Sequence, residues 1–98
     1  MTEAREDEFQ EGAVVSRTLI GRATGTVTLF AFDEGQGPSE HTAPFDALAH
    51  VLEGKAEIVV AGKPLLTNAG EAVLMLANQP HALKAFTKFK MLLTMIRS

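Results

Sequence analysis

Apolar residues along this chain gather in short runs that glycine, proline and small polar residues separate. The runs are rich in Val, Ile, Thr and Phe and recur about every ten residues, a pattern that favours strands. No run has the period of an amphipathic helix. We therefore expect an all-β barrel or sandwich, with strands over residues 13–20, 26–32, 47–53, 55–61, 65–67, 72–76, 82–87 and 89–96.

The last run, residues 89–96, is largely apolar at both odd and even positions. Its composition also suits a buried helix, but its length and the strands before it favour a strand. A strand that is apolar on both faces has to be covered on both. Because a chain of 98 residues has little material for that cover, we expect a homodimer.

Length and composition indicate one compact domain. The apolar fraction of 46% excludes disorder for the body of the chain, and the absence of cysteine excludes disulfides and thiolate metal sites. No apolar run approaches the roughly 18 residues of a membrane helix. The N-terminus is acidic where a signal peptide would be basic, so we expect a cytoplasmic protein without a membrane partner.

The net charge of −3 hides an uneven distribution. Residues 1–11 hold five acidic side chains against Arg5, whereas acidic and basic residues nearly balance in the rest of the chain. We expect residues 1–11 to form a flexible tail and residues 12–98 to form the single domain. The body has no strong basic field with aromatic residues among the charges, so no nucleic-acid partner is expected.

Two segments, residues 35–54 and 70–83, carry a signature. In the first, Gly35, His41 and Gly54 match the pattern G-x5-H-x-H-x(3,4)-E-x6-G; in the second, Gly70 and His81 match G-x5-P-x-G-x2-H-x3-N. These are the two motifs of the cupin superfamily, which the chain resembles in its small single-domain, cupin 2-like form over residues 14–97. The resemblance implies a double-stranded β-helix, or jelly-roll barrel of the RmlC-like type, with a metal held in its mouth by three His and one further ligand.

This chain departs from that pattern at the ligand positions. Ala43 and Ala47 stand where the family has its second and third ligands, so the motif is degenerate and only His41 and His81 remain. Asn78 replaces a motif glycine and suits the left-handed conformation that such a glycine adopts. The reduced site leaves open one divalent ion (Fe, Mn, Ni or Zn) on His41 and His81, with Asp46 as the third ligand.

His50 is the other histidine near this site. Strand alternation places its side chain on the face opposite Ala47, away from the cavity. A bulge of one residue after Asp46 would reverse that placement, and the sequence leaves both arrangements open. Around the ligand we expect an apolar pocket, with His41, His81, Asp46, Phe45 and Met75 as its binding residues.

Three functions fit these residues, and the sequence decides neither for nor against catalysis. The first is the binding of a small anionic molecule in the barrel mouth, because a pair of imidazoles can bind a carboxylate or phosphate without metal. The second is a metal-dependent enzyme of the dioxygenase or isomerase type that uses His41, His81 and Asp46. The third is a non-catalytic module for dimerisation or structure.

Overall fold

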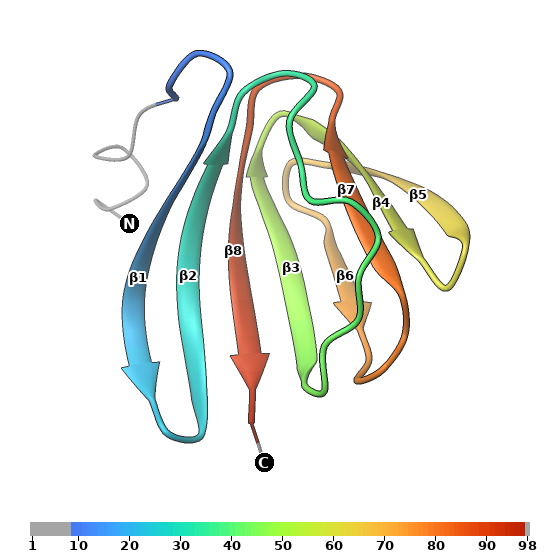
Figure 1. Cartoon of the computed structure of the whole chain (residues 1–98). Helices are drawn as coiled ribbons and strands as arrows, with labels where there is room; N and C mark the ends of the chain where they lie inside the picture. The colour runs from blue at the N-terminus through green and yellow to red at the C-terminus, as the bar shows by residue number, and fades with distance from the viewer. Residues whose placement is uncertain (1–8, 98) are drawn as a thin grey trace.

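The chain folds into two antiparallel sheets that face each other and contain no helix over residues 9–97, the range that the computed structural model describes. One sheet has five strands in the order β1-β2-β8-β3-β6 and the other has three in the order β5-β4-β7 (Figure 1). The strands are β1 (Val14–Arg22), β2 (Gly25–Phe32), β3 (Asp46–Glu53), β4 (Lys55–Val60), β5 (Lys63–Asn68), β6 (Ala72–Met75), β7 (His81–Ala85) and β8 (Phe89–Ile96).

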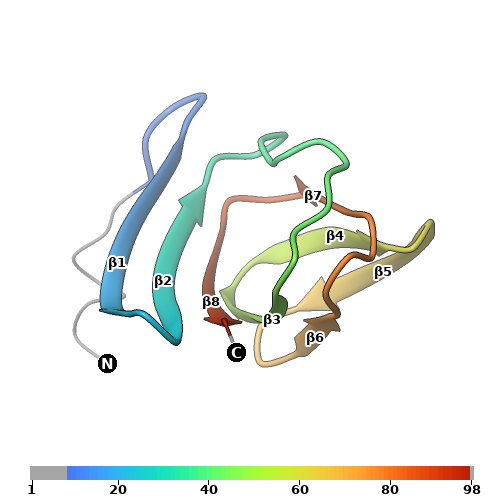
Figure 2. The same ribbon diagram turned by 60° about the horizontal axis from the view of Figure 1, so that its bottom comes forward.

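The chain passes between the two sheets several times, as Figure 2 shows from the end of the barrel. β8 lies between β2 and β3, although all of β4 to β7 separates β3 from β8 in the sequence. The expected all-β jelly-roll barrel is therefore confirmed. No helix among the described residues could cross a membrane.

The core lies between the inner faces of the sheets. On β3 the odd residues Ala47, Ala49 and Val51 are buried, which is the alternation of a strand with one face inward. Phe32 and Phe89 are register partners on β2 and β8, and their rings stack 4.4 Å apart at an angle of 4°. From the opposite sheet, Ile58 completes this cluster and is fully buried.

Every expected strand is present, and the observed bounds lie within one residue of the expected ones except at the end of β1, the start of β5 and the end of β7. β5 begins at Lys63 and includes Pro64, where a turn was expected, because β5 is an edge strand and does not need every backbone N–H in the sheet. β7 ends at Ala85 rather than at residue 87. It ends there because the N–H groups of Phe86 and Thr87 both turn to the Lys55 carbonyl.

Gly54 makes the turn between β3 and β4 and is a position where only glycine fits. Its φ of 80° lies in the left-handed region. A Cβ at this position would run into the backbone carbonyl of Lys88 and the Cβ of Phe89. This turn therefore packs closely against the start of β8, at the end of the barrel where Phe89 is buried.

The outer face of the five-stranded sheet is only partly covered within the chain. Lys90 on this face is buried and pairs with Glu53 (3.3 Å between Nζ and Oε2). Leu48, Leu74 and Ile96 are 42%, 57% and 51% exposed.

The expected tail over residues 1–11 falls mostly outside the described residues, so the division of the chain into a tail and a domain stays a prediction.

Candidate functional site

The segment between β2 and β3, residues 33–45, forms one wall of the barrel mouth. Backbone hydrogen bonds tie it along the free edge of β7: Gly35 N–H donates to Ala85, Ala85 N–H to Gln36, and Leu83 N–H to Pro38. Further along, His41 and His81 exchange backbone hydrogen bonds in both directions, at 3.0 and 2.9 Å. The segment therefore extends the three-stranded sheet, as the green chain crossing in front of β7 in Figure 1 illustrates.

This pairing brings the two motif histidines together. Their ring centroids are 4.3 Å apart and the ring planes make an angle of 68°, an edge-to-face arrangement. His81 is 8% exposed, whereas His41 lies at the surface of the mouth. Two residues that are 40 positions apart in the sequence thus form one pair, as the family resemblance implies.

Each imidazole is oriented by a carbonyl group two residues before it. Nδ1 of His41 lies 2.9 Å from the Ser39 carbonyl oxygen, and Nδ1 of His81 lies 3.1 Å from that of Gln79. Because a carbonyl oxygen only accepts, Nδ1 carries the proton in both rings. In the neutral form each Nε2 is then an acceptor or a metal ligand, and in the protonated form it is a donor to an anion.

A cavity of about 430 Å³ opens beside the two histidines. Of the twelve residues that line it, only His41, His81 and Gln36 have polar side chains. The rest of the wall is apolar and comes mainly from both sheets: Phe30, Phe32, Met75, Leu83, Met91 and Leu93. A largely apolar cavity with a few convergent polar groups is the usual form of a small-molecule site.

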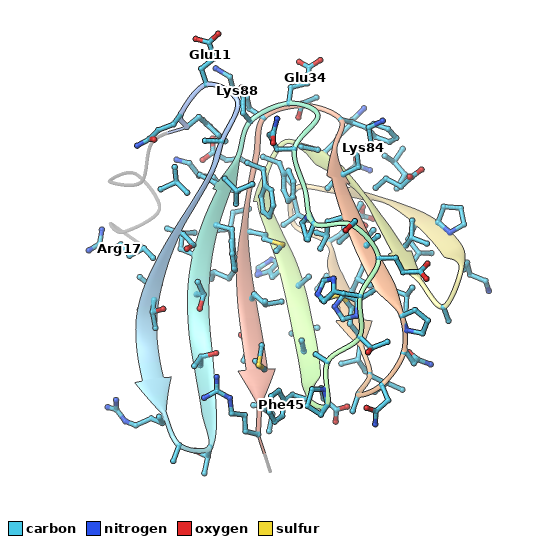
Figure 3. The ribbon with its side chains drawn as sticks, in the orientation of Figure 1. Glu11, Arg17, Glu34, Phe45, Lys84 and Lys88 are labelled. Carbon is cyan, nitrogen blue, oxygen red and sulfur yellow. The ribbon has the colours of Figure 1, made fainter. Side chains whose placement is uncertain are left out.

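Two of the expected binding residues lie elsewhere. Asp46 is exposed, shares the outward parity of Leu48, and accepts a hydrogen bond from the Ala77 N–H (2.8 Å to Oδ1). Phe45 packs with Arg97, whose guanidinium lies 5.5 Å from the ring centroid. Figure 3 shows Phe45 at the C-terminal end of the barrel, opposite the end that carries Glu34 and Lys88. Neither residue lines the cavity, whereas Met75 does.

His50 lies on the outer face, the placement that alternation alone predicted. It pairs with Ala72 on β6 and with Leu92 on β8, and the register between β3 and β8 is continuous from Asp46 to Val51. The irregularity in this pairing comes after Val51, too late to turn His50 inward. Asn78 adopts the expected left-handed conformation with a φ of 66°, in the turn that leads to His81.

The donor set does not match a three-ligand metal centre. Two histidine side chains line the mouth, but residues 9–97 contain no group of three or more His, Cys, Asp or Glu side chains that could hold one ion. Ala43 and Ala47 contribute only methyl groups, and Asp46 is engaged with Ala77. Two imidazoles do not complete the sets of three or more ligands typical of catalytic centres.

Gln36 is the polar cavity residue that the sequence did not indicate. Its segment looked like an ordinary loop by composition, and no motif position falls on it. Its placement follows from the pairing of the segment with β7, in which its carbonyl accepts from Ala85. Among residues 9–97 its side-chain amide has no hydrogen-bond partner, so it is free to meet a ligand.

Asp33 fastens the rim of the mouth. Its carboxylate accepts hydrogen bonds from the Gly12 N–H (2.6 Å) and the Glu34 N–H (2.9 Å), and so ties the start of β1 to the end of β2. The bond from Gly12, then that from Glu34, hold the pKa of Asp33 below its ordinary value, since both stabilise the ionised form. Val14, two residues after Gly12, lines the cavity.

Known proteins share this architecture. A family model described as a cupin domain matches residues 28–97. A conserved protein of unknown function from Streptococcus pyogenes is similar at 34% identity, with 97% of this chain and 83% of that chain covered and a TM-score of 0.91. A cupin superfamily protein from Desulfitobacterium hafniense is 26% identical over 97% of this chain and 87% of its own, with a TM-score of 0.92.

A third structure is longer than this chain. A cupin 2 conserved barrel domain protein from Leptotrichia buccalis is 38% identical over 95% of this chain, with a TM-score of 0.90, but only 45% of that protein is covered. The chain thus spans about half of the Leptotrichia protein. No curated protein matches the chain.

Proposed function

This chain belongs to the cupin family, and from that premise we propose that it binds a small organic anion in the barrel mouth, beside His41 and His81. The observation that carries the proposal is the orientation of the two rings. With each Nδ1 bonded to a backbone carbonyl, each Nε2 is left for a ligand beside an otherwise apolar cavity. A protonated ring donates to a carboxylate, and a neutral ring accepts from a carboxylic acid.

The closeness of the rings adds to this argument. Two imidazolium cations with centroids 4.3 Å apart repel each other, and an anion bound beside both rings offsets that repulsion. The second Nε2 remains available when the first is engaged, so one carboxylate can bridge the pair. This arrangement needs no third protein ligand and is therefore unaffected by Ala43 and Ala47.

A metal-dependent dioxygenase or isomerase remains the competing function. It requires a third protein ligand beside His41 and His81, and Asp46 lies on the outer parity of β3 with its carboxylate on Ala77. The two functions differ in a measurable quantity, the metal content of tag-free protein grown in metal-supplemented medium. Binding without metal predicts well under one equivalent of Fe, Mn, Ni or Zn per chain, and near one equivalent would overturn it in favour of the enzyme.

Anion binding itself is tested by titrating the protein with small carboxylates. Isothermal titration calorimetry suits this chain because it lacks Trp and Tyr for fluorescence. We expect His41→Ala and His81→Ala each to weaken carboxylate binding by about tenfold or more, since each removes one charge-assisted hydrogen bond. His50→Ala, on the outer face, is the matched control and should bind as the wild type does.

We also propose that the protein is a homodimer formed through the outer face of the five-stranded sheet. Leu48 is the register partner of Leu74, so the two exposed side chains adjoin on this face, next to the half-buried Leu92. Contiguous exposed leucines on a sheet favour association. Leu74→Lys should shift the mass in solution from dimer to monomer. Leu66→Lys is the control, because Leu66 is as exposed as Leu74 (56% and 57%) but lies on the other sheet, and it should leave the mass unchanged. A monomeric wild type would refute this proposal.

A further inference from the structure

The apolar wall of the cavity restricts what the bound anion can be. Its polar side chains are not spread around the wall but lie on the segment 33–45 and the start of β7. Opposite them stand Phe30, Met91 and Leu93 from β2 and β8. A hydroxyl group buried against those residues would lose its water without gaining a partner, which costs binding energy.

The two polar positions of the cavity are also far apart. Gln36 pairs with Ala85 at one end of β7 and His41 pairs with His81 at the other, four residues away or roughly 13 Å along the strand. Leu83 and Pro38 lie between them. One carboxylate cannot reach both ends, so the charged pole of the cavity is the histidine pair alone.

We infer that the ligand is a monocarboxylic acid with an apolar aromatic or branched aliphatic body, rather than a polyhydroxylated acid or an inorganic anion. This inference rests on the proposed function and adds the chemical class. The carboxyl group lies between the two Nε2 atoms, and the body fills the space against Phe30, Leu83 and Met91. Apolar surface removed from water then supplies most of the affinity, and the histidines supply the orientation.

The experiment compares matched probes by isothermal titration calorimetry: 3-phenylpropionate, its neutral amide 3-phenylpropanamide, gluconate and inorganic phosphate. We expect 3-phenylpropionate to bind about tenfold or more tightly than each of the other three, because it alone has both a charge and an apolar body. Equal or tighter binding of gluconate or phosphate would overturn the inference and leave anion binding in place. Equal binding of the amide would overturn the proposed anion site itself, and so would the failure of every probe to bind.

Two variants fix the direction in which the acid lies. Gln36→Leu should not lower the affinity for 3-phenylpropionate, because the carboxylate is at the other end of the cavity and Leu extends the apolar wall around the body, while His81→Ala should lower it about tenfold. Circular dichroism confirms that both variants are folded. The reverse result, with loss at Gln36 and none at His81, would overturn the inference.

Discussion

The interior of this barrel has a filled half and a hollow half, and they differ in what they do for the molecule. In the filled half, Phe89, Ile58 and Val51 are fully buried and Phe89 stacks on Phe32. In the hollow half, side chains from the same two sheets stop short and leave about 430 Å³ beside His41 and His81. Folded proteins seldom keep voids larger than a water molecule, so the hollow half is the candidate site and the filled half supports it.

The largest effect is expected from emptying the filled half. Phe89→Ala removes a fully buried ring together with its stack on Phe32, and should lower the free energy of unfolding by about 3–5 kcal/mol. Chemical denaturation followed by circular dichroism measures this. Phe86→Ala is the control, because its ring is 45% exposed, and it should cost far less. Equal losses would mean that the two halves do not differ in packing as described.

A second test adds volume to each half instead of removing it. Ala56→Leu in the filled half, where Ala56 is fully buried, should cost about 1–3 kcal/mol of stability from overpacking. Leu93→Phe enlarges a side chain of the cavity wall and should change stability by less than about 1 kcal/mol. The same Leu93→Phe variant should lose its affinity for acids with an apolar body. If the two substitutions cost the same stability, the cavity is not space that a side chain can enter.

The histidines should matter little for stability and much for binding. Each imidazole makes one hydrogen bond to a backbone carbonyl, and a bond of this kind contributes about 0.5–1.5 kcal/mol. Thermal and chemical unfolding of His41→Ala and His81→Ala should therefore show losses within that range. A loss of several kcal/mol at either position would make that residue part of the structural core and contradict its assignment to the site.

The smallest effect concerns the rim and depends on pH. The folded-state pKa of Asp33 lies below its ordinary value of 3.8, so its ionised form stabilises the fold above that value. This contribution is lost as the pH falls through the lowered folded-state pKa. Unfolding measured from about pH 5 down to about pH 2.5 should therefore show a shallower loss of stability in Asp33→Asn than in the wild type.

Glu34→Gln is the control for the rim. The Glu34 backbone donates to Asp33, but its own carboxylate takes no part in that bond. The variant should follow the wild-type curve below pH 4 more closely than Asp33→Asn does. If Asp33→Asn instead matches the wild type throughout, the bond to Gly12 does not fasten β1.

The fold could be predicted almost entirely from the sequence because its strands are short, alternating and separated by glycine. Alternation on β3 placed Ala47 inward and His50 outward without any knowledge of the neighbouring strands. Two of the boundaries that differed depend on partners distant in the chain. β5 tolerates Pro64 because β5 is an edge strand, and β7 ends where the N–H groups of Phe86 and Thr87 donate to the Lys55 carbonyl. No local signal carries that information.

The site could be predicted only in part. His41 and His81 meet as the resemblance implied, since backbone pairing between their segments brings them together. A role for Asp46 in the cavity required the loop end to bend inward, and the regular pairing of β3 with β8 from Asp46 onward prevents it. Gln36 escaped notice because a single polar residue in a loop has no periodicity, and its position depends on the edge of β7.

The attachment of segment 33–45 to the rest of the barrel has a kinetic consequence. Seven backbone hydrogen bonds tie this segment to the rest of the barrel, five with β7, one from Asn78 to Ala43 and one from Asp33 to Ala13, so it is part of the wall and not a lid. A ligand can therefore arrive and leave without waiting for a loop to open. We expect its association rate to rise in proportion to ligand concentration without reaching a plateau, and affinity differences among ligands to reside in how fast each one dissociates.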